Sequence, residues 1–93
     1  MDVHFTTQVF KEGRSFVAHT PQLDVSSCGT TRDKAIANLQ EAVRLFLEEA
    51  DRMGTLDQIL EEAGYSKGKN GIRGPLWIGT GELSISLPGH AEP

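Results

Sequence analysis

Hydrophobic residues recur every three or four positions through Ser27–Met53, the longest periodic segment of the chain. They are Ile36, Leu39, Val43, Phe46, Ala50 and Met53, with Ala35, Ala42 and Leu47 widening the stripe. This spacing predicts an amphipathic helix with one buried face. Thr30 is the expected N-cap, Asp33 can complete a capping box, and Gly54 is suited to end the helix. We therefore expect a helix over Thr31–Met53 on which the rest of the chain packs.

Strict alternation of hydrophobic and polar residues predicts strands ahead of this helix. Val3–Phe10 and Arg14–Thr20 alternate, and Glu12-Gly13 between them is a turn signal. Leu23–Cys28 is expected to form a short third strand, although its serines have low strand propensity. The three strands together predict an antiparallel meander.

A two-residue loop at Glu12-Gly13 would set the register of the first two strands. Val9 would then lie opposite Phe16, and Thr7 opposite Ala18, on the apolar side of the sheet. The other side of the sheet has no obvious cover. It would carry His4, Phe10, Val17 and His19.

The segment after the long helix is expected to be less regular. Thr55 opens a short second helix that Gly64 closes, and Ser66–Pro75 is rich in glycine and charge, which is typical of a loop. Leu76–Ile78 is extended, and the alternating Leu83–Leu87 is expected to add another strand to the sheet.

The predicted fold class is α+β, an antiparallel β-meander packed against a long helix in the order β-β-β-α-α-β. Residues 1–88 are expected to form a single domain and residues 89–93 a disordered tail. The expected core consists of Ile36, Leu39, Val43, Phe46, Phe5, Val9 and Phe16. Open sheet edges and a half-apolar second face predict self-association, most simply a homodimer, with higher homo-oligomers as the alternative.

Charge is distributed unevenly along the 93 residues, whose net charge is −4. Carboxylates cluster at Glu48, Glu49, Asp51, Asp57, Glu61 and Glu62. A net negative charge argues against a general phosphate-binding surface, so no direct nucleic-acid contact is expected. The single cysteine excludes an internal disulfide and fits a reducing compartment, and no hydrophobic run reaches the length of a membrane span. We expect a cytoplasmic protein that does not contact membranes.

Candidate reactive groups do not assemble into a catalytic pattern. His4 and His19 could be diagonal neighbours, but zinc needs three or four ligands, so two surface histidines are the simpler interpretation. Cys28 lacks the surroundings of a thiol nucleophile, and Gly79-Thr80-Gly81 lacks the third glycine and the helix of a dinucleotide site. We predict no catalytic residue, metal or cofactor.

Three consecutive segments have a recognisable order and spacing. They are FVAHTPQL at residues 16–23, SSCGTT at residues 26–31 and RDKAIANLQEAVRLFLEE at residues 32–49. From Arg14 to Glu62 the chain resembles HicB-type antitoxins, a family in bacterial toxin–antitoxin pairs. The residues on the fixed points of the family's helix pattern are Ala35, Asn38, Leu39, Glu41 and Ala42. Leu23-Asp24 stands where the family often has Pro-Gly, and Gly29-Thr30-Thr31 replaces Gly-Asp-Thr.

The resemblance implies a partial ribonuclease-H-like sheet and a non-catalytic antitoxin that neutralises a small, basic, HicA-like RNA-cleaving toxin. Many members continue into a DNA-binding segment, but neither DNA-binding motif fits the chain after Gly54, so operator binding is not inferred. The expected partner-binding surface is the acidic cluster, and the second choice is the open side of the sheet.

Two other functions remain open. One is a protein-interaction domain of the same fold with a different partner. The other, weaker one is a metal-dependent nuclease, for which the strands offer only Asp2, Asp24 and Glu82 as carboxylates.

Overall fold

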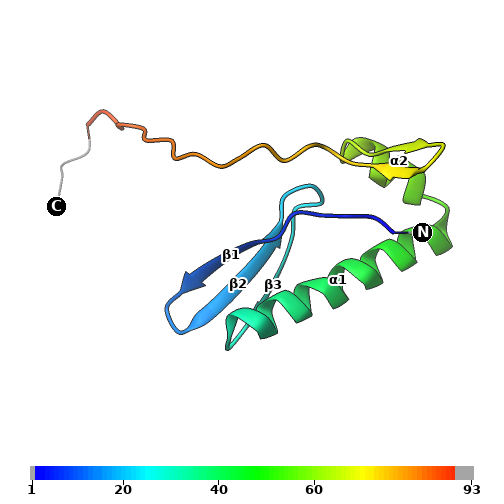
Figure 1. Ribbon diagram of the computed structural model, residues 1–93. Helices are drawn as coiled ribbons and strands as arrows, with labels where there is room; N and C mark the ends of the chain where they lie inside the picture. Colours follow the sequence, from blue (N-terminus) through cyan, green and yellow to red (C-terminus); the bar gives the residue numbers. More distant parts are fainter. Residues whose placement is uncertain (1, 90–93) are drawn as a thin grey trace.

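A long helix lies against one face of a three-stranded antiparallel sheet in the computed structural model, which describes residues 2–89 (Figure 1). The sheet consists of β1 (Gln8–Glu12), β2 (Ser15–Thr20) and β3 (Val25–Gly29), followed by α1 (Arg32–Met53), α2 (Leu56–Glu62) and a separate hairpin of β4 (Ser66–Gly68) and β5 (Gly71–Arg73). The predicted α+β class and the meander of three strands before the long helix are confirmed. Residues 90–93 of the expected tail lie outside the described residues.

The β1–β2 turn lies one residue later than predicted. Gly13 and Arg14 form the loop, and Gly13 has a φ of +60°, as the first loop position of a type II′ turn requires. Val9 therefore pairs with Ala18 instead of Phe16, a shift of two positions. Because side chains alternate with a period of two, this shift leaves Val9, Phe16 and Ala18 on the same, helix-covered face.

The segment ahead of β1 is not a strand, so the predicted strand Val3–Phe10 is only partly correct. Hydrogen bonds from side chains hold this segment in place of the strand pairing that was expected. The Thr6 amide donates to Gln22 Oε1 at 3.1 Å, and Gln22 Nε2 donates to Thr6 Oγ1 at 2.8 Å. Further back, the Tyr65 hydroxyl donates to the His4 carbonyl at 2.6 Å. These bonds satisfy polar groups that would otherwise require a sheet partner.

Both ends of α1 are capped, but the first cap differs from the prediction. Thr31, not Thr30, is the N-cap, and its hydroxyl accepts from the Lys34 amide at 3.1 Å. Gly54 ends the helix in the left-handed conformation with φ +78°, as predicted.

The core lies between α1 and the sheet. Its fully buried members are Ala18, Ala35 and Leu39, and around them pack Val9, Phe16, Val25, Ile36 and Val43. The prediction that Phe46 is buried is wrong, because 41% of it is exposed. The 22-residue α1 is about 33 Å long, whereas the six-residue β2 spans about 20 Å. The second half of α1 therefore extends past the sheet that would have covered it.

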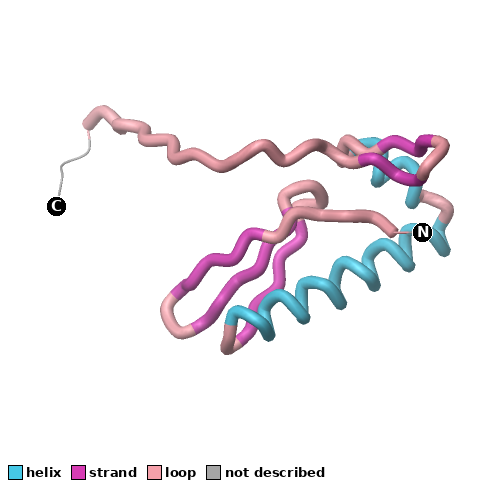
Figure 2. The backbone as a smooth tube through the Cα atoms, in the orientation of Figure 1, coloured by secondary structure: helices cyan, strands magenta, loops and turns pink. Residues whose placement is uncertain are grey.

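The chain after α2 departs furthest from the prediction. The expected loop Ser66–Pro75 contains the β4–β5 hairpin, whose strands have only three residues each. The expected strand Leu83–Leu87 is not formed, and nothing in residues 74–87 is helix or strand. Residues 74–89, called the arm below, leave the α2 corner and run clear of the sheet (Figure 2).

Candidate functional surfaces

The acidic surface occupies the end of α1 and the whole of α2. Its members are Glu48, Glu49, Asp51, Asp57, Glu61 and Glu62, and all of them are exposed. Residues 41–62 hold seven carboxylates and only two basic side chains. The turn at Gly54 joins the two helices, so the carboxylates share one helical corner of the molecule (Figure 1).

Basic residues neutralise part of this surface. Arg44 contacts Glu41 and lies 2.7 Å from Glu48, and Arg52 contacts Glu49. The hydrogen bonds that Arg44 donates to Glu41, together with the charges of Glu41 and Glu48, raise the pKa of Arg44 above its ordinary value, so the guanidinium stays charged. Exposed pairs of this kind contribute little stability, and a partner's cations can replace them at low cost.

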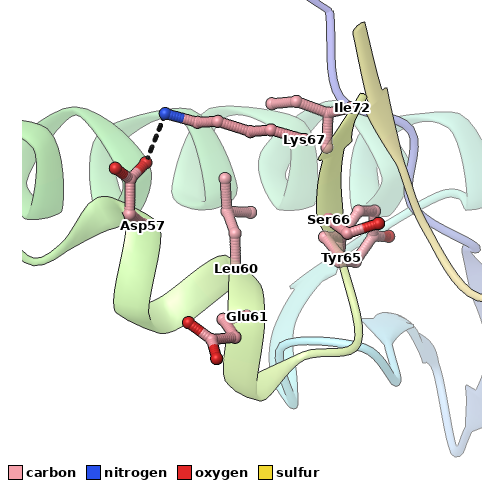
Figure 3. Close-up of a pocket in the computed structure, with 7 residues that line it drawn as sticks. All are labelled: Asp57, Leu60, Glu61, Tyr65, Ser66, Lys67 and Ile72. Carbon is pink, nitrogen blue, oxygen red and sulfur yellow. Dashed lines mark ion pairs between the residues drawn. The ribbon is translucent and has the colours of Figure 1, made fainter. Parts of the chain in front are cut away.

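A small pocket adjoins the acidic surface between α2 and the β4–β5 hairpin (Figure 3). Its volume is about 330 Å³, and Leu60, Tyr65 and Ile72 form its apolar part. Lys67 Nζ lies 2.9 Å from Asp57 Oδ1 across its rim. Since this lysine is already paired with a carboxylate, the pocket has no free cation to hold an anionic ligand.

The outer face of the sheet, turned away from α1, carries most of the second predicted surface. Phe10 pairs with Val17, and His19 pairs with Gln8 on the same face. Phe10 is 51% exposed, while Val17 is half-buried. His4 does not belong to this face, because it precedes β1.

His4 and His19 are therefore not diagonal neighbours on one face of the sheet. His19 Nε2 lies 2.9 Å from Asp24 Oδ1 and its Nδ1 lies 3.4 Å from Gln8 Oε1, whereas His4 is tied to Tyr65 through its backbone. His19 thus bridges β1 and the turn ahead of β3 as a structural contact.

The carboxylates that a nuclease would need belong to different parts of the fold. Asp2 lies beside α1, Asp24 contacts His19, and Glu82 lies on the exposed arm. Within residues 2–89, no group of three or more histidine, cysteine, aspartate or glutamate side chains could hold a metal ion.

An apolar groove that the sequence did not predict runs between the segment ahead of β1 and α1. Its volume is about 810 Å³, and its apolar lining consists of Val3, Phe5, Ile36, Leu39, Val43 and Leu47. The α1 side of the groove follows the periodic stripe of the helix. The other wall could not be foreseen, because the residues ahead of β1 were expected to lie within the sheet.

Tyr65 was also missed, since a single aromatic residue between two glycine-rich segments has no periodicity. It is only 5% exposed, and its ring centroid lies 5.2 Å from that of Phe5. A Cβ on Gly74 would lie 2.3 Å from Tyr65 Cε2, so the backbone at the start of the arm is pressed against the ring. One side chain therefore joins α2, the N-terminal segment and the arm.

The fold and these surfaces define a small α+β protein in which a three-stranded antiparallel sheet is followed by a long helix. None of its described helices is long and apolar enough to cross a membrane. No family model, no curated protein and no solved structure matches the chain.

Proposed function

We propose that this chain is a non-catalytic antitoxin that binds and silences a small, basic, HicA-like RNA-cleaving toxin. The proposal rests on the resemblance to HicB-type antitoxins and on the exposed acidic surface. Two places in the fold support the resemblance, because residues of its pattern have clear roles there.

The first place is the corner between β3 and α1. Asn38 Nδ2 donates to the Cys28 carbonyl at 2.8 Å, and Ala35 is completely buried. A Cβ on Gly29 would lie 2.6 Å from the Ala35 backbone nitrogen, so only glycine fits the corner. Gly29, Ala35 and Asn38 therefore act together to fix the helix against the sheet.

The second place is the pair of turns where this chain departs from the family pattern. Asp24, in the position of the pattern's glycine, has a φ of +54°, the left-handed backbone that glycine adopts freely. Aspartate tolerates this conformation better than most residues. Thr31, in the position of the pattern's threonine, is the helix N-cap. Asp24 thus keeps the backbone of the pattern's glycine, and the pattern's threonine is kept as the helix cap.

The excess of carboxylates at residues 41–62 is the observation that supports a basic protein as the partner. An RNA-cleaving site is positively charged because it holds phosphates. Opposite charge accelerates association and favours one orientation, while apolar contacts slow dissociation. The acidic surface therefore suits a basic partner whose nucleic-acid site is to be covered.

Co-expression with the neighbouring reading frame tests the function. If that frame encodes a short basic ribonuclease, expressing it alone should arrest growth, and adding this chain should restore growth. The purified chain should also stop RNA cleavage by that protein at equimolar concentration. Unchanged cleavage in the presence of excess chain contradicts the proposal.

A charge-reversal series tests the surface. Changing Glu48, Glu49, Glu61 and Glu62 to lysine should slow association strongly at low salt and leave the fold intact, because all four are exposed. As a matched pair, Glu61→Lys/Glu62→Lys is compared with Glu12→Lys/Glu82→Lys, which reverses two exposed carboxylates outside the surface.

Equal association rates and equal salt dependence for the quadruple variant and the parent would remove the acidic surface from the interface. The outer face of the sheet around Phe10, Val17 and His19 is then the next candidate.

A further inference from the structure

The arm carries more exposed hydrophobic surface than any other segment that the structure describes. Its large apolar residues and their exposed fractions are Leu76 85%, Trp77 45%, Ile78 91%, Leu83 84%, Ile85 69% and Leu87 64%. Glu82 is its only charged side chain among residues 74–89. Exposed apolar segments of this size mark interaction sites.

The second half of the arm has the pattern of a strand with one buried face. Leu83, Ile85 and Leu87 alternate with Ser84 and Ser86. A strand directs alternate side chains to opposite sides, so the three aliphatic residues would face one surface together. Within residues 2–89 these three side chains stay largely exposed, so this half of the arm is suited to an apolar surface that it does not contact here.

The base of the arm is fixed in direction. Gly74 is pressed against the Tyr65 ring, and a Cβ on Gly64 would lie 3.0 Å from Pro75 Cγ. Pro75 has a fixed φ and restricts the residue before it. From this base the arm runs past the sheet without joining it (Figures 1 and 2).

The groove between the N-terminal segment and α1 matches the arm in chemistry and length. Its apolar lining is formed by Phe5 and five aliphatic side chains, with polar and charged residues such as Arg44 and Glu48 among the rest, and along α1 it runs from Ile36 to Glu48, about 18 Å. Leu83–Leu87 in extended conformation measures about 13 Å. β1, which continues from the N-terminal wall of the groove, has a strand partner on one side only. The edge of β1 next to the groove is therefore open to a further strand.

We propose that two copies of this chain exchange arms, with Leu83–Leu87 of each copy lying in the groove of the other. Each chain brings one arm and one groove, so a twofold axis uses both and closes the assembly at two copies. This inference is independent of the proposed toxin partner.

Light scattering on the purified chain tests the exchange. The parent should have twice the 10.1 kDa mass of one chain at tens of micromolar. The variant Leu83→Ser/Ile85→Ser/Leu87→Ser should weaken dimerisation roughly a hundredfold or more and give 10.1 kDa. Its circular dichroism should not change, since the altered residues are exposed in the single chain. Ser84→Asn/Ser86→Asn is the control and should remain dimeric.

Cross-linking identifies the occupant of the groove. In a Cys28→Ser background, chains with Val43→Cys are mixed with chains carrying Ile85→Cys and oxidised, and a linked pair of chains should form. The control mixture replaces Ile85→Cys by Ser84→Cys and should link much more slowly. A third sample carries Val43→Cys and Ile85→Cys in one chain.

Each of three results would overturn the exchange. They are a monomeric parent, a triple variant that stays dimeric, and a doubly substituted chain that links only to itself. The last result would place the arm in its own groove. A monomeric parent that binds another protein through its arm would assign the arm to that partner.

Discussion

The hydroxyl of Tyr65 donates a hydrogen bond to the backbone carbonyl of His4, 2.6 Å away, and so joins two residues 61 positions apart. The same ring contacts Phe5 and the backbone of Gly74. The N-terminal segment and the start of the arm are thus held by one side chain that follows α2.

Tyr65→Phe should lower the free energy of unfolding by about 0.5–1.5 kcal/mol, because it removes this hydrogen bond and keeps the ring. Tyr65→Ala should cost about 3–5 kcal/mol, since it also removes a buried aromatic side chain. Urea denaturation of the parent and both variants measures the two steps. Equal stability of the parent and Tyr65→Phe would contradict a role for the hydrogen bond.

The stability that Tyr65 contributes should depend on pH in the alkaline range. Burial raises the pKa of the Tyr65 hydroxyl above its ordinary value of 10.0. As the pH rises, the unfolded chain therefore loses this proton first, while the folded chain retains it. The contribution is complete below the unfolded pKa and is lost as the pH rises through the higher folded pKa.

Urea midpoints at several pH values should consequently show the difference between the parent and Tyr65→Phe shrinking above pH 10. Tyr65 is the only tyrosine, so ultraviolet absorbance of the phenolate reports its titration directly. A phenolate that forms at the ordinary pKa in the folded protein would contradict the burial.

Gly74→Ala should destabilise the protein by roughly 1–3 kcal/mol, because the new Cβ would overlap the Tyr65 ring. Gly79→Ala is the matched control. A Cβ at Gly79 meets nothing within 4 Å, so this variant should stay within about 0.5 kcal/mol of the parent. Thermal unfolding of the two variants measures the difference, and equal melting temperatures would show that Gly74 is not confined.

The variants Leu39→Ala and Phe46→Ala compare the half of α1 that the sheet covers with the half that extends past the sheet. Leu39 is 3% exposed in the core, and its truncation should cost about 2–5 kcal/mol. Phe46 is 41% exposed, so its truncation should cost less than about 1 kcal/mol. A loss of similar size for both variants in urea would mean that Phe46 is covered in solution, as it would be in an assembly.

Periodicity predicted those parts of the fold that repeat. α1 was found because one apolar stripe runs through 22 residues, and the faces of β1 and β2 were found because they depend only on odd or even position. The register was not found, since Val9 opposite Phe16 and Val9 opposite Ala18 bury the same face. The Tyr65 contacts depend on one residue without a pattern.

The residues after α2 show a different limit of prediction from the sequence. Alternation at Leu83–Leu87 predicted a further strand of the sheet, but these residues form no strand, since alternation does not indicate where a partner strand lies. The β4–β5 strands are too short for alternation to identify them. The candidate surfaces were located only in part, because the acidic residues lie on predicted helices while the groove depends on a segment that was misplaced.

The bond between the Thr6 amide and the Gln22 side chain has a consequence for hydrogen exchange. Amides inside β2 lose their hydrogen bonds and exchange only when the sheet opens. The Thr6 amide loses its hydrogen bond whenever the Gln22 side chain changes rotamer. The Thr6 amide should therefore exchange many times faster than that of Ala18, at a rate insensitive to mild denaturant. Solvent can thus reach the wall of the groove at Thr6 while Tyr65 still holds the same segment at His4 and Phe5.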